Sequence, residues 1–361
     1  MRLRFCLCCL AALSLLGGCA AIGPPRVERD RIEYNTSITE SWKRQILLNV
    51  VKIRYVEPIF FLDVGEIVSS YSMETGGTIG ASRTAYDLSG TSDSSLLEFE
   101  GAAKYTDRPT VTYRPLTGNA FFRGIMSPVP MQNILASIES GASARFVLNL
   151  GLRSINGFRN ESLTAKGFRA ADPEFDRIVE LLAALQDLNA LHIVREPRRD
   201  DGPLPHLCLN LSARREEGKV RALRSELQGL LGLDGGMDEY RIGFGSTVIN
   251  ENTIVLQTYS LAQMLASIAG RMEVPEADVA DRKAVPGRRI TNKGLFDQMM
   301  VHSSENKPPD AFASVQYRGH WFWVDDRDLV TKRVFSFIML AVTLMDKGGQ
   351  DTQLQLTVPT Q

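Results

Sequence analysis

The sequence predicts an α+β or mixed α/β fold, in which helices pack on mixed sheets in one or two subdomains. Helix-like apolar spacing and short strand-like runs alternate along residues 131–345, and the composition, 44% hydrophobic and 23% charged, is typical of a globular protein. Lys plus Arg number 41 and Asp plus Glu 42, giving a formal charge of −1. This balance argues against nucleic acid as a partner, because nucleic-acid-binding proteins usually carry a basic excess.

A first helix is predicted from Ser37 onward. Ser37 and Glu40 have the Ser-x-x-Glu spacing of a capping box, and Pro58 should end the helix by Glu57. Apolar residues recur there at three- and four-residue steps: Trp42, Ile46, Leu47, Val50, Val51 and Ile53. A stripe of this width predicts a helix that packs on a core.

A β-rich region follows this helix. Residues 59–71 are rich in β-branched and aromatic side chains, and a polar stretch rich in Gly, Ser and Thr covers residues 72–107. Short strands are expected at 85–88 and 96–100, and residues 110–113 alternate like a strand. The pattern predicts a twisted hairpin with a mobile tip.

The rest of the chain alternates between helices and strands. Asp172 followed by Pro173 is a helix start signal. Residues 334–345 are almost entirely apolar but too few to span a membrane, so a buried core helix is expected there. Helices are expected at 131–140, 173–188, 220–231, 261–272 and 327–345. Strands are expected at 145–154, 207–211, 240–244, 253–258, 311–317, 321–324 and 354–358.

Composition divides the chain into four parts. Residues 1–18 are a leader, and residues 19–34 are expected to be a flexible tether, because the Gly-Pro-Pro at 23–25 disfavours a helix. Two α/β regions follow, at 35–194 and 206–361. The charged, Pro-containing segment between them is the predicted boundary.

The leader has the organisation of a secretory signal. Arg2 and Arg4 give a positive start, and residues 5–16 are apolar apart from Ser14. These twelve residues would rise only about 18 Å as a helix, which is shorter than the roughly 30 Å hydrocarbon core of a membrane. A permanent transmembrane anchor is therefore not expected.

The leader ends in Leu16-Gly17-Gly18-Cys19, which resembles the lipobox of bacterial lipoproteins. The resemblance implies that the leader is removed before Cys19 and that Cys19 carries acyl chains, such as palmitate. Ala20 stands where inner-membrane retention usually shows Asp, so the resemblance favours the outer membrane, with the protein facing the periplasm. The alternative is an ordinary secretory leader that is removed without lipidation.

The cysteines agree with this hypothesis. Three of the five leave with the leader and one is Cys19, so Cys208 would remain alone, without an intramolecular disulfide. Cys208 follows His206 by two residues, which admits a thiol nucleophile with an imidazole base. However, residues 207–209 fit a buried strand, and free Cys is commonly buried. A buried structural role is the preferred interpretation.

Metal sites have little support from local motifs. Asp325, Asp326 and Asp328 could bind a hard cation, but Asp325 or Asp326 as a helix cap is the preferred interpretation, with Asp328 favouring the positive end of the helix. The other histidines lack zinc-ligand spacing: His192, His302 and His320. No metal, cofactor or catalytic residue is expected from these motifs, although a zinc site built from distant residues stays an open alternative.

Aromatic residues of one predicted hairpin are the best binding candidates. Alternation places Trp321 and Trp323 on one face of a strand and Phe322 on the other, with Tyr317 on the preceding strand. Exposed aromatic side chains of this kind can anchor a protein partner or stack on sugars. The alternative is that one face is core and one Trp is half-covered.

Two segments, 41–49 and 317–323, resemble a group of uncharacterised Gram-negative envelope lipoproteins. The resemblance supports the location and implies no activity. The expected function is a membrane-anchored, non-enzymatic interaction or assembly module, whose partners are the lipid bilayer, through Cys19, and envelope proteins. The alternative is a periplasmic hydrolase that acts on envelope polymers through dispersed Asp, Glu or His residues.

Overall fold

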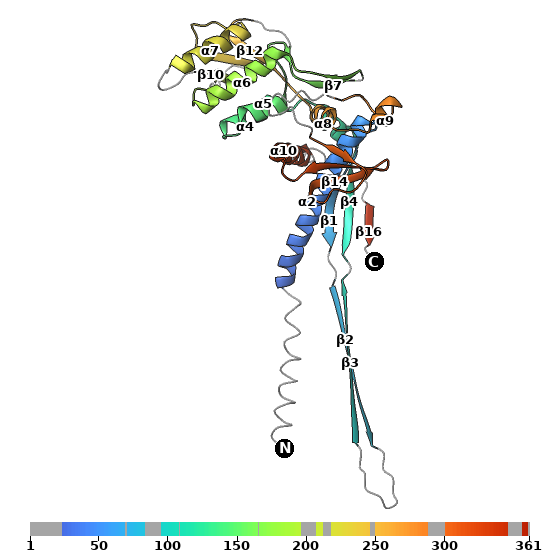
Figure 1. Cartoon of the computed structure of the whole chain (residues 1–361). Coiled ribbons are helices and arrows are strands. Elements are labelled where there is room, and N and C mark those ends of the chain that lie inside the picture. The colour runs from blue at the N-terminus through green and yellow to red at the C-terminus, as the bar shows by residue number, and fades with distance from the viewer. Residues whose placement is uncertain are drawn as a thin grey trace, which may run out of the picture. The chain divides into compact units, whose positions relative to one another are not determined.

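The structure, a computed structural model, describes residues 24–68, 71–83, 95–107, 109–164, 166–195, 207–211, 218–245, 250–287, 300–345 and 356–359. Contacts within the chain group it into two compact units (Figure 1). Unit 1 consists of Met1–Phe60 and Thr117–Gly349, and unit 2 of Phe61–Leu116 and Gln350–Gln361. The predicted α+β class is confirmed. The predicted leader and Cys19 lie outside the described residues.

Helix α2 covers Pro24–Arg54, so the prediction of a flexible tether at 19–34 is wrong for its described part. Proline is tolerated in the first turn of a helix, and Arg29 and Glu33 form an i,i+4 ion pair at 3.6 Å. Ser37 lies inside the helix and does not begin it. The predicted apolar face is confirmed, with five side chains buried: Trp42, Ile46, Leu47, Val50 and Val51.

Unit 2 contains two antiparallel β structures. Strands β1 (Phe61–Val68), β4 (Thr110–Leu116) and β16 (Leu356–Pro359) form a sheet with β4 in the centre. Strands β2 (Tyr71–Arg83) and β3 (Ser95–Asp107) form a long two-stranded ribbon. The predicted hairpin and edge strand are confirmed, whereas the strand expected at 85–88 lies outside the described residues.

The largest sheet belongs to unit 1. Its six strands are ordered β6 (Phe158–Arg159), β5 (Leu152–Ile155), β12 (Thr253–Thr258), β11 (Glu239–Phe244), β10 (Leu207–Asn210) and β9 (His192–Arg195). Only β11 and β12 pair in parallel among the described strands of this sheet. Because β9 and β10 are antiparallel neighbours, the predicted boundary between 35–194 and 206–361 does not separate two domains.

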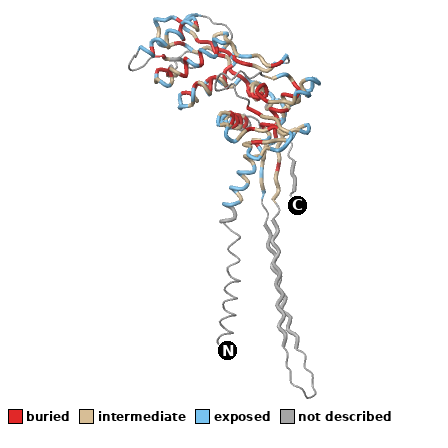
Figure 2. The backbone as a smooth tube through the Cα atoms, viewed as in Figure 1, coloured by how far each residue is buried: buried red, intermediate tan, exposed pale blue. Residues whose placement is uncertain are grey.

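Four helices pack with this sheet around one core: α4 (Met131–Glu139), α5 (Ala144–Gly151), α6 (Pro173–Asp187) and α7 (Gly218–Leu231). Figure 2 shows buried residues along the strands and the inward faces of these helices. The strand predicted at 145–154 is wrong, because α5 occupies most of it and β5 only the end. A short apolar run fits a buried helix as well as a buried strand.

The remainder of unit 1 packs around α2. It contains α8 (Leu261–Gly270), α10 (Leu329–Met345) and a sheet ordered β13 (His302–Ser304), β15 (His320–Asp325) and β14 (Ala311–Tyr317). Shorter elements complete it: α3 (Gly118–Met126), α9 (Glu276–Ala280), β7 (Ser162–Thr164) and β8 (Gly167–Arg169). These four short elements and β13 were not predicted.

The predicted core helix is confirmed in α10, although only one face of this helix is buried. Val334, Phe335 and Ile338 are buried, but Leu340 is 58% exposed.

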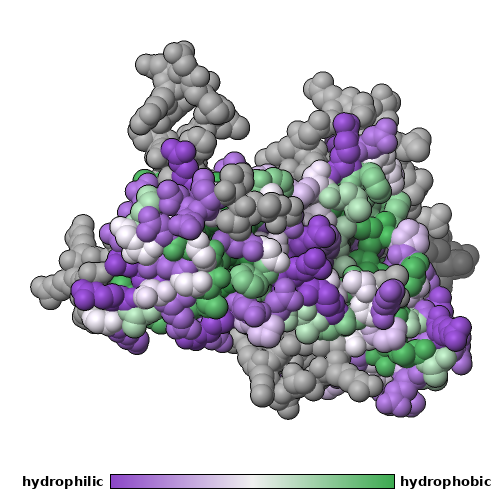
Figure 3. All heavy atoms as spheres, turned by 90° about the horizontal axis from the view of Figure 1, so that it is seen from above, coloured by the Kyte–Doolittle hydropathy of each residue, from purple (hydrophilic) through white to green (hydrophobic). Residues whose placement is uncertain are grey.

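Within the described ranges, no helix is long and apolar enough to cross a membrane. On the face seen in Figure 3, hydrophobic and hydrophilic residues are interspersed.

Candidate functional site

The aromatic candidates lie together on the β14–β15 hairpin. Phe322 and Val324 are fully buried, whereas Trp321 and Trp323 are half-buried, so the predicted alternation is confirmed. Arg318 and Gly319 form the turn with positive φ values of 48° and 84°. The hairpin therefore directs one face into the core and leaves both Trp side chains partly accessible.

Tyr317 is held by internal contacts. Its hydroxyl donates a hydrogen bond to Glu57, its ring lies 5.2 Å from the Tyr55 ring, and Arg318 Nη2 contacts Glu57 at 3.0 Å. Burial and the bond to Glu57 raise the pKa of Tyr317. The Tyr317 side chain thus joins the hairpin to the end of α2.

The two Trp side chains also have neighbours within the chain. The Trp323 ring lies 4.8 Å from the ring of His302, and Lys307 Nζ lies 5.5 Å from the centre of the Trp321 ring. A partner would have to bind the partly exposed edges of this surface. Partner binding by Tyr317, Trp321 and Trp323 therefore stays a prediction.

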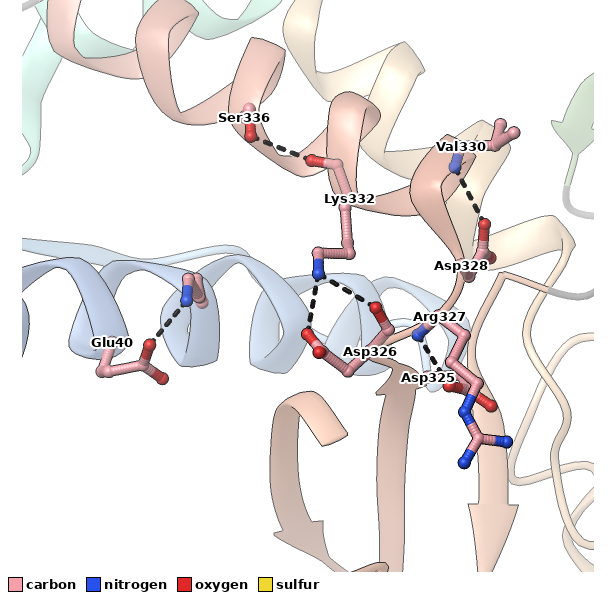
Figure 4. Close-up of polar contacts among 9 residues, drawn as sticks. Glu40, Asp325, Asp326, Arg327, Asp328, Val330, Lys332 and Ser336 are labelled. Atoms are coloured by element: carbon pink, nitrogen blue, oxygen red, sulfur yellow. Dashed lines mark hydrogen bonds and ion pairs between the residues drawn. The ribbon is translucent and has the colours of Figure 1, made fainter. Parts of the chain in front are cut away.

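The acidic loop before α10 works as a helix cap (Figure 4). Asp328 Oδ1 accepts the backbone N–H groups of Val330 and Thr331, both at 3.0 Å. Asp325 accepts the N–H of Arg327, and Asp326 forms an ion pair with Lys332 at 2.8 Å. The prediction that this acidic loop caps the helix is confirmed, but the capping residue is Asp328 and not Asp325 or Asp326.

The other sequence candidates are dispersed. Cys208 lies in β10 opposite Val194 and Arg241, while His206 lies outside the described residues. His192, His302 and His320 lie in different strands. In the described part of the chain, no group of three or more His, Cys, Asp or Glu side chains could hold a metal ion.

A cavity of about 660 Å³ lies between the β5–β6 hairpin, the β7–β8 hairpin and α8 in unit 1. We call it the arginine pocket, because three arginines line it. Its lining residues are Arg153, Ser154, Gly157, Arg159, Asn160, Ser162, Leu163, Thr164, Arg169, Gln257, Tyr259, Gln263 and Ala266. No Asp, Glu or His is among these described residues.

A tight turn brings two of the arginines into the same pocket. Asn156 and Gly157 have φ values of 46° and 90°, which suit the two-residue turn of a β-hairpin. The Asn156 side chain fixes the turn, because it donates to the Leu231 carbonyl at 2.8 Å and accepts the Val255 N–H at 2.7 Å. Ser154 then pairs with Arg159 across the hairpin.

Arg169 is positioned by Asp172. Its guanidinium donates to the Asn160 carbonyl and contacts Asp172 Oδ1 at 3.1 Å. Asp172 Oδ2 accepts the Arg159 N–H at 2.7 Å and makes no capping bond to α6. Asp172 therefore compensates the charge of Arg169 and ties β6 in place.

Arg153 and Arg159 carry the uncompensated charge of the pocket. Both are exposed, and within the described ranges neither forms an ion pair. Two positive side chains without an acidic partner attract anions, because their electrostatic potentials add in a shared concavity. The local formal charge of the lining, with Asp172 set against Arg169, is thus positive.

Behind the pocket lies a buried ion pair between Glu161 and Arg271. Ser267 donates to the Glu161 carboxylate at 2.8 Å, and the Tyr259 hydroxyl donates to the Glu161 carbonyl. Burial raises the pKa of Tyr259, so its hydroxyl stays protonated. The Tyr259 side chain is consequently a wall of the pocket and not a base.

Comparisons of the chain with protein-family models, with curated proteins and with solved structures find no match. The local chemistry therefore carries the assignment of the site. Sequence reasoning missed the arginine pocket, although Asn156-Gly157 between β-prone residues was a signal for the hairpin that builds it.

Proposed function

We propose that this chain is a lipid-anchored protein of the bacterial outer membrane, facing the periplasm, and that it acts as a non-enzymatic interaction or assembly module. The anchor in this proposal is acylated Cys19, supported by the lipobox-like ending of the leader. Two or more acyl chains give stable membrane anchoring, since each buried CH₂ contributes about 0.8 kcal/mol.

The observation that carries the binding role is the arginine pocket. Arg153 and Arg159 face a cavity with no acidic partner among the described residues, and the other polar lining groups are hydroxyls and amides. Such groups bind and orient a ligand, whereas hydrolysis of a glycan normally requires two facing carboxylates. The lining favours binding over the alternative, a periplasmic hydrolase.

In-cell crosslinking followed by purification from native membranes tests the proposal. Three forms are compared: wild type, Cys19→Ala, and the double variant Arg153→Gln/Arg159→Gln. Wild type should be in the outer-membrane fraction with a discrete set of envelope partners. Cys19→Ala should leave that fraction, and the double variant should stay in it but lose partners.

A matched control for the double variant is Arg44→Gln/Arg333→Gln. Both control arginines are exposed, lie outside the pocket and have no ion pair within the described residues. Loss of the same partners from the control would contradict a role for the pocket. Release of soluble fragments from envelope polymers by purified wild type would replace the proposal with the hydrolase.

A further inference from the structure

We infer that the arginine pocket binds an oxyanion group, a phosphate or a carboxylate, carried by a small hydroxyl-bearing molecule such as a sugar. This inference rests on the proposed function, because it names the ligand class of the same pocket. The argument has three parts: charge, donor inventory and size.

Charge is the first part. Arg169 is compensated by Asp172 at 3.1 Å, which leaves the guanidinium groups of Arg153 and Arg159 as the net charge of the lining. A guanidinium presents a planar fork of N–H donors that matches phosphate and carboxylate oxygens in pairs. Two such groups on one hairpin suit an anion better than a neutral ligand.

The donor inventory is the second part. Gln257 Oε1 already accepts a bond from Ser154 at 3.0 Å, and Gln263 Oε1 accepts the Ser260 N–H at 3.0 Å. The Nε2 groups of Gln257 and Gln263 donate to no partner among the described residues. The pocket therefore offers more free donors than free acceptors, and a ligand rich in acceptor oxygens complements it.

Thr164 and Tyr259 add little to this balance, because both hydroxyls already donate within the chain. The Thr164 hydroxyl donates to the Gly167 carbonyl at 2.8 Å, and the Tyr259 hydroxyl to the Glu161 carbonyl. Each can still accept a bond from a ligand hydroxyl. The pocket can thus bind sugar hydroxyls beside the anionic group.

Size is the third part. The cavity of about 660 Å³ lies in the range of small-molecule sites, roughly 300–1,000 Å³. It is larger than one inorganic ion needs. An oxyanion with an attached organic part uses both the charged wall at β5–β6 and the polar wall at β7–β8 and α8.

Calorimetric titration of the full-length protein in detergent tests the inference. The probes are glucose 1-phosphate, glucuronate, inorganic phosphate and glucose. At least one sugar anion should bind tighter than glucose and inorganic phosphate, and its affinity should fall as salt rises. Tighter binding of glucose 1-phosphate or of glucuronate identifies phosphate or carboxylate as the preferred group. Equal binding of glucose and both sugar anions would overturn the inference.

Three variants locate the binding. Arg153→Gln/Arg159→Gln should lose at least tenfold in affinity, while Arg44→Gln/Arg333→Gln should remain within twofold of wild type. Arg153→Lys/Arg159→Lys keeps the charge without the planar fork and should lie between them. Wild-type affinity in the Gln variant, with an unchanged circular dichroism spectrum, would overturn the inference.

Failure here is distinguishable from failure of the proposed function. If no probe binds but crosslinked partners still depend on Arg153 and Arg159, the oxyanion inference is wrong and the interaction module stands. If a sugar anion binds but Cys19→Ala stays in the membrane fraction, the ligand class stands and the anchor is wrong.

Discussion

The carboxylate of Asp172 accepts the backbone N–H of Arg159 at 2.7 Å, although Asp172 directly precedes α6 and has the residue type of a helix cap. One acidic side chain thus fixes the edge strand β6 and, through its other oxygen, the guanidinium of Arg169. The wall of the arginine pocket depends on this bond more than the start of α6 does, because Pro173 already favours the helical φ.

Asp172 therefore offers a test that separates its two bonds. Asp172→Asn keeps an acceptor for the Arg159 N–H, whereas Asp172→Ala removes it. We expect Asp172→Ala to destabilise by about 1–2 kcal/mol and Asp172→Asn by less than about 1 kcal/mol, since an ion pair whose side chains are 35% and 36% exposed contributes little. Thermal unfolding measures both, and equal destabilisation would mean that the backbone bond contributes nothing.

Gly270 allows the β7–β8 hairpin to lie against α8. A Cβ at Gly270 would lie 2.8 Å from Phe168 Cδ2, so Gly270→Ala should displace β8 and destabilise by about 1–3 kcal/mol. The control is Gly229→Ala in α7, where no atom lies within 4 Å of the added Cβ. That variant should stabilise by about 0.5–1 kcal/mol, as measured by thermal unfolding. A neutral Gly270→Ala would show that Phe168 moves without cost.

The buried pair between Glu161 and Arg271 should be sensitive to loss of one charge. Glu161→Gln should destabilise by about 3–5 kcal/mol, because both side chains are at most 7% exposed. Glu180→Gln, at an exposed pair with Arg177, should change the stability much less, because solvent screens that pair. Thermal unfolding of both variants measures the two losses of stability. A similar small loss in each would contradict a strongly coupled buried pair.

His302 and Glu273 should make stability depend on pH. Their contact at 3.1 Å raises the pKa of His302 above its ordinary 6.5 and lowers that of Glu273 below its ordinary 4.5. The His302 contribution is complete below pH 6.5 and is lost as pH rises through the raised value. The Glu273 contribution is complete above pH 4.5 and is lost as pH falls through the lowered value.

The pair should therefore stabilise most between pH 4.5 and 6.5. Glu273→Gln should lower the unfolding midpoint in that window and have a smaller effect at pH 9. Since both side chains are about a third or more exposed, we expect less than about 1 kcal/mol. A pH-independent difference between wild type and Glu273→Gln would show that packing, and not charge, holds this contact.

Asn49 should matter more than other polar residues of α2. Its buried side chain donates to the Phe60 carbonyl at 2.8 Å and accepts the Phe60 N–H at 2.9 Å. Asn49→Ala should destabilise by about 1–3 kcal/mol, whereas Asn35→Ala, at an exposed site of the same helix, should change little. Loss of protection from hydrogen exchange at Phe60 would report the broken clamp directly.

Hydrophobic periodicity over long segments predicted most helices and strands, but the composition of charged and Pro-containing segments gave wrong predictions. The apolar faces of α2 and α6 were predicted correctly, because six apolar residues in each recur at three- and four-residue steps. The charged segment 26–33 lacks such spacing and is still helical, because its Arg and Glu residues have high helix propensity and an i,i+4 ion pair supports the helix. The charged, Pro-containing stretch between β9 and β10 has the composition of a linker but connects adjacent strands.

The arginine pocket was harder to predict, because its walls come from two parts of the chain that are far apart in sequence, residues 153–169 and 257–266. The turn at Asn156-Gly157 is readable locally, and it would have placed Arg153 near Arg159. The packing of β7–β8 on α8 depends on Gly270, whose role appears only when Phe168 is seen beside it. Local patterns carry no information on such long-range packing.

The central position of β4 sets an order of events during synthesis. β4 pairs with β1, which precedes it by about 50 residues, but its other edge pairs with β16, which begins 240 residues after Leu116 (356 − 116). One edge of β4 therefore stays unpaired while most of unit 1 is synthesised. An open strand edge invites pairing with another chain. Termination after Gly349 but before Leu356 would leave that edge permanently open, so such truncated chains should associate even though unit 1 is intact.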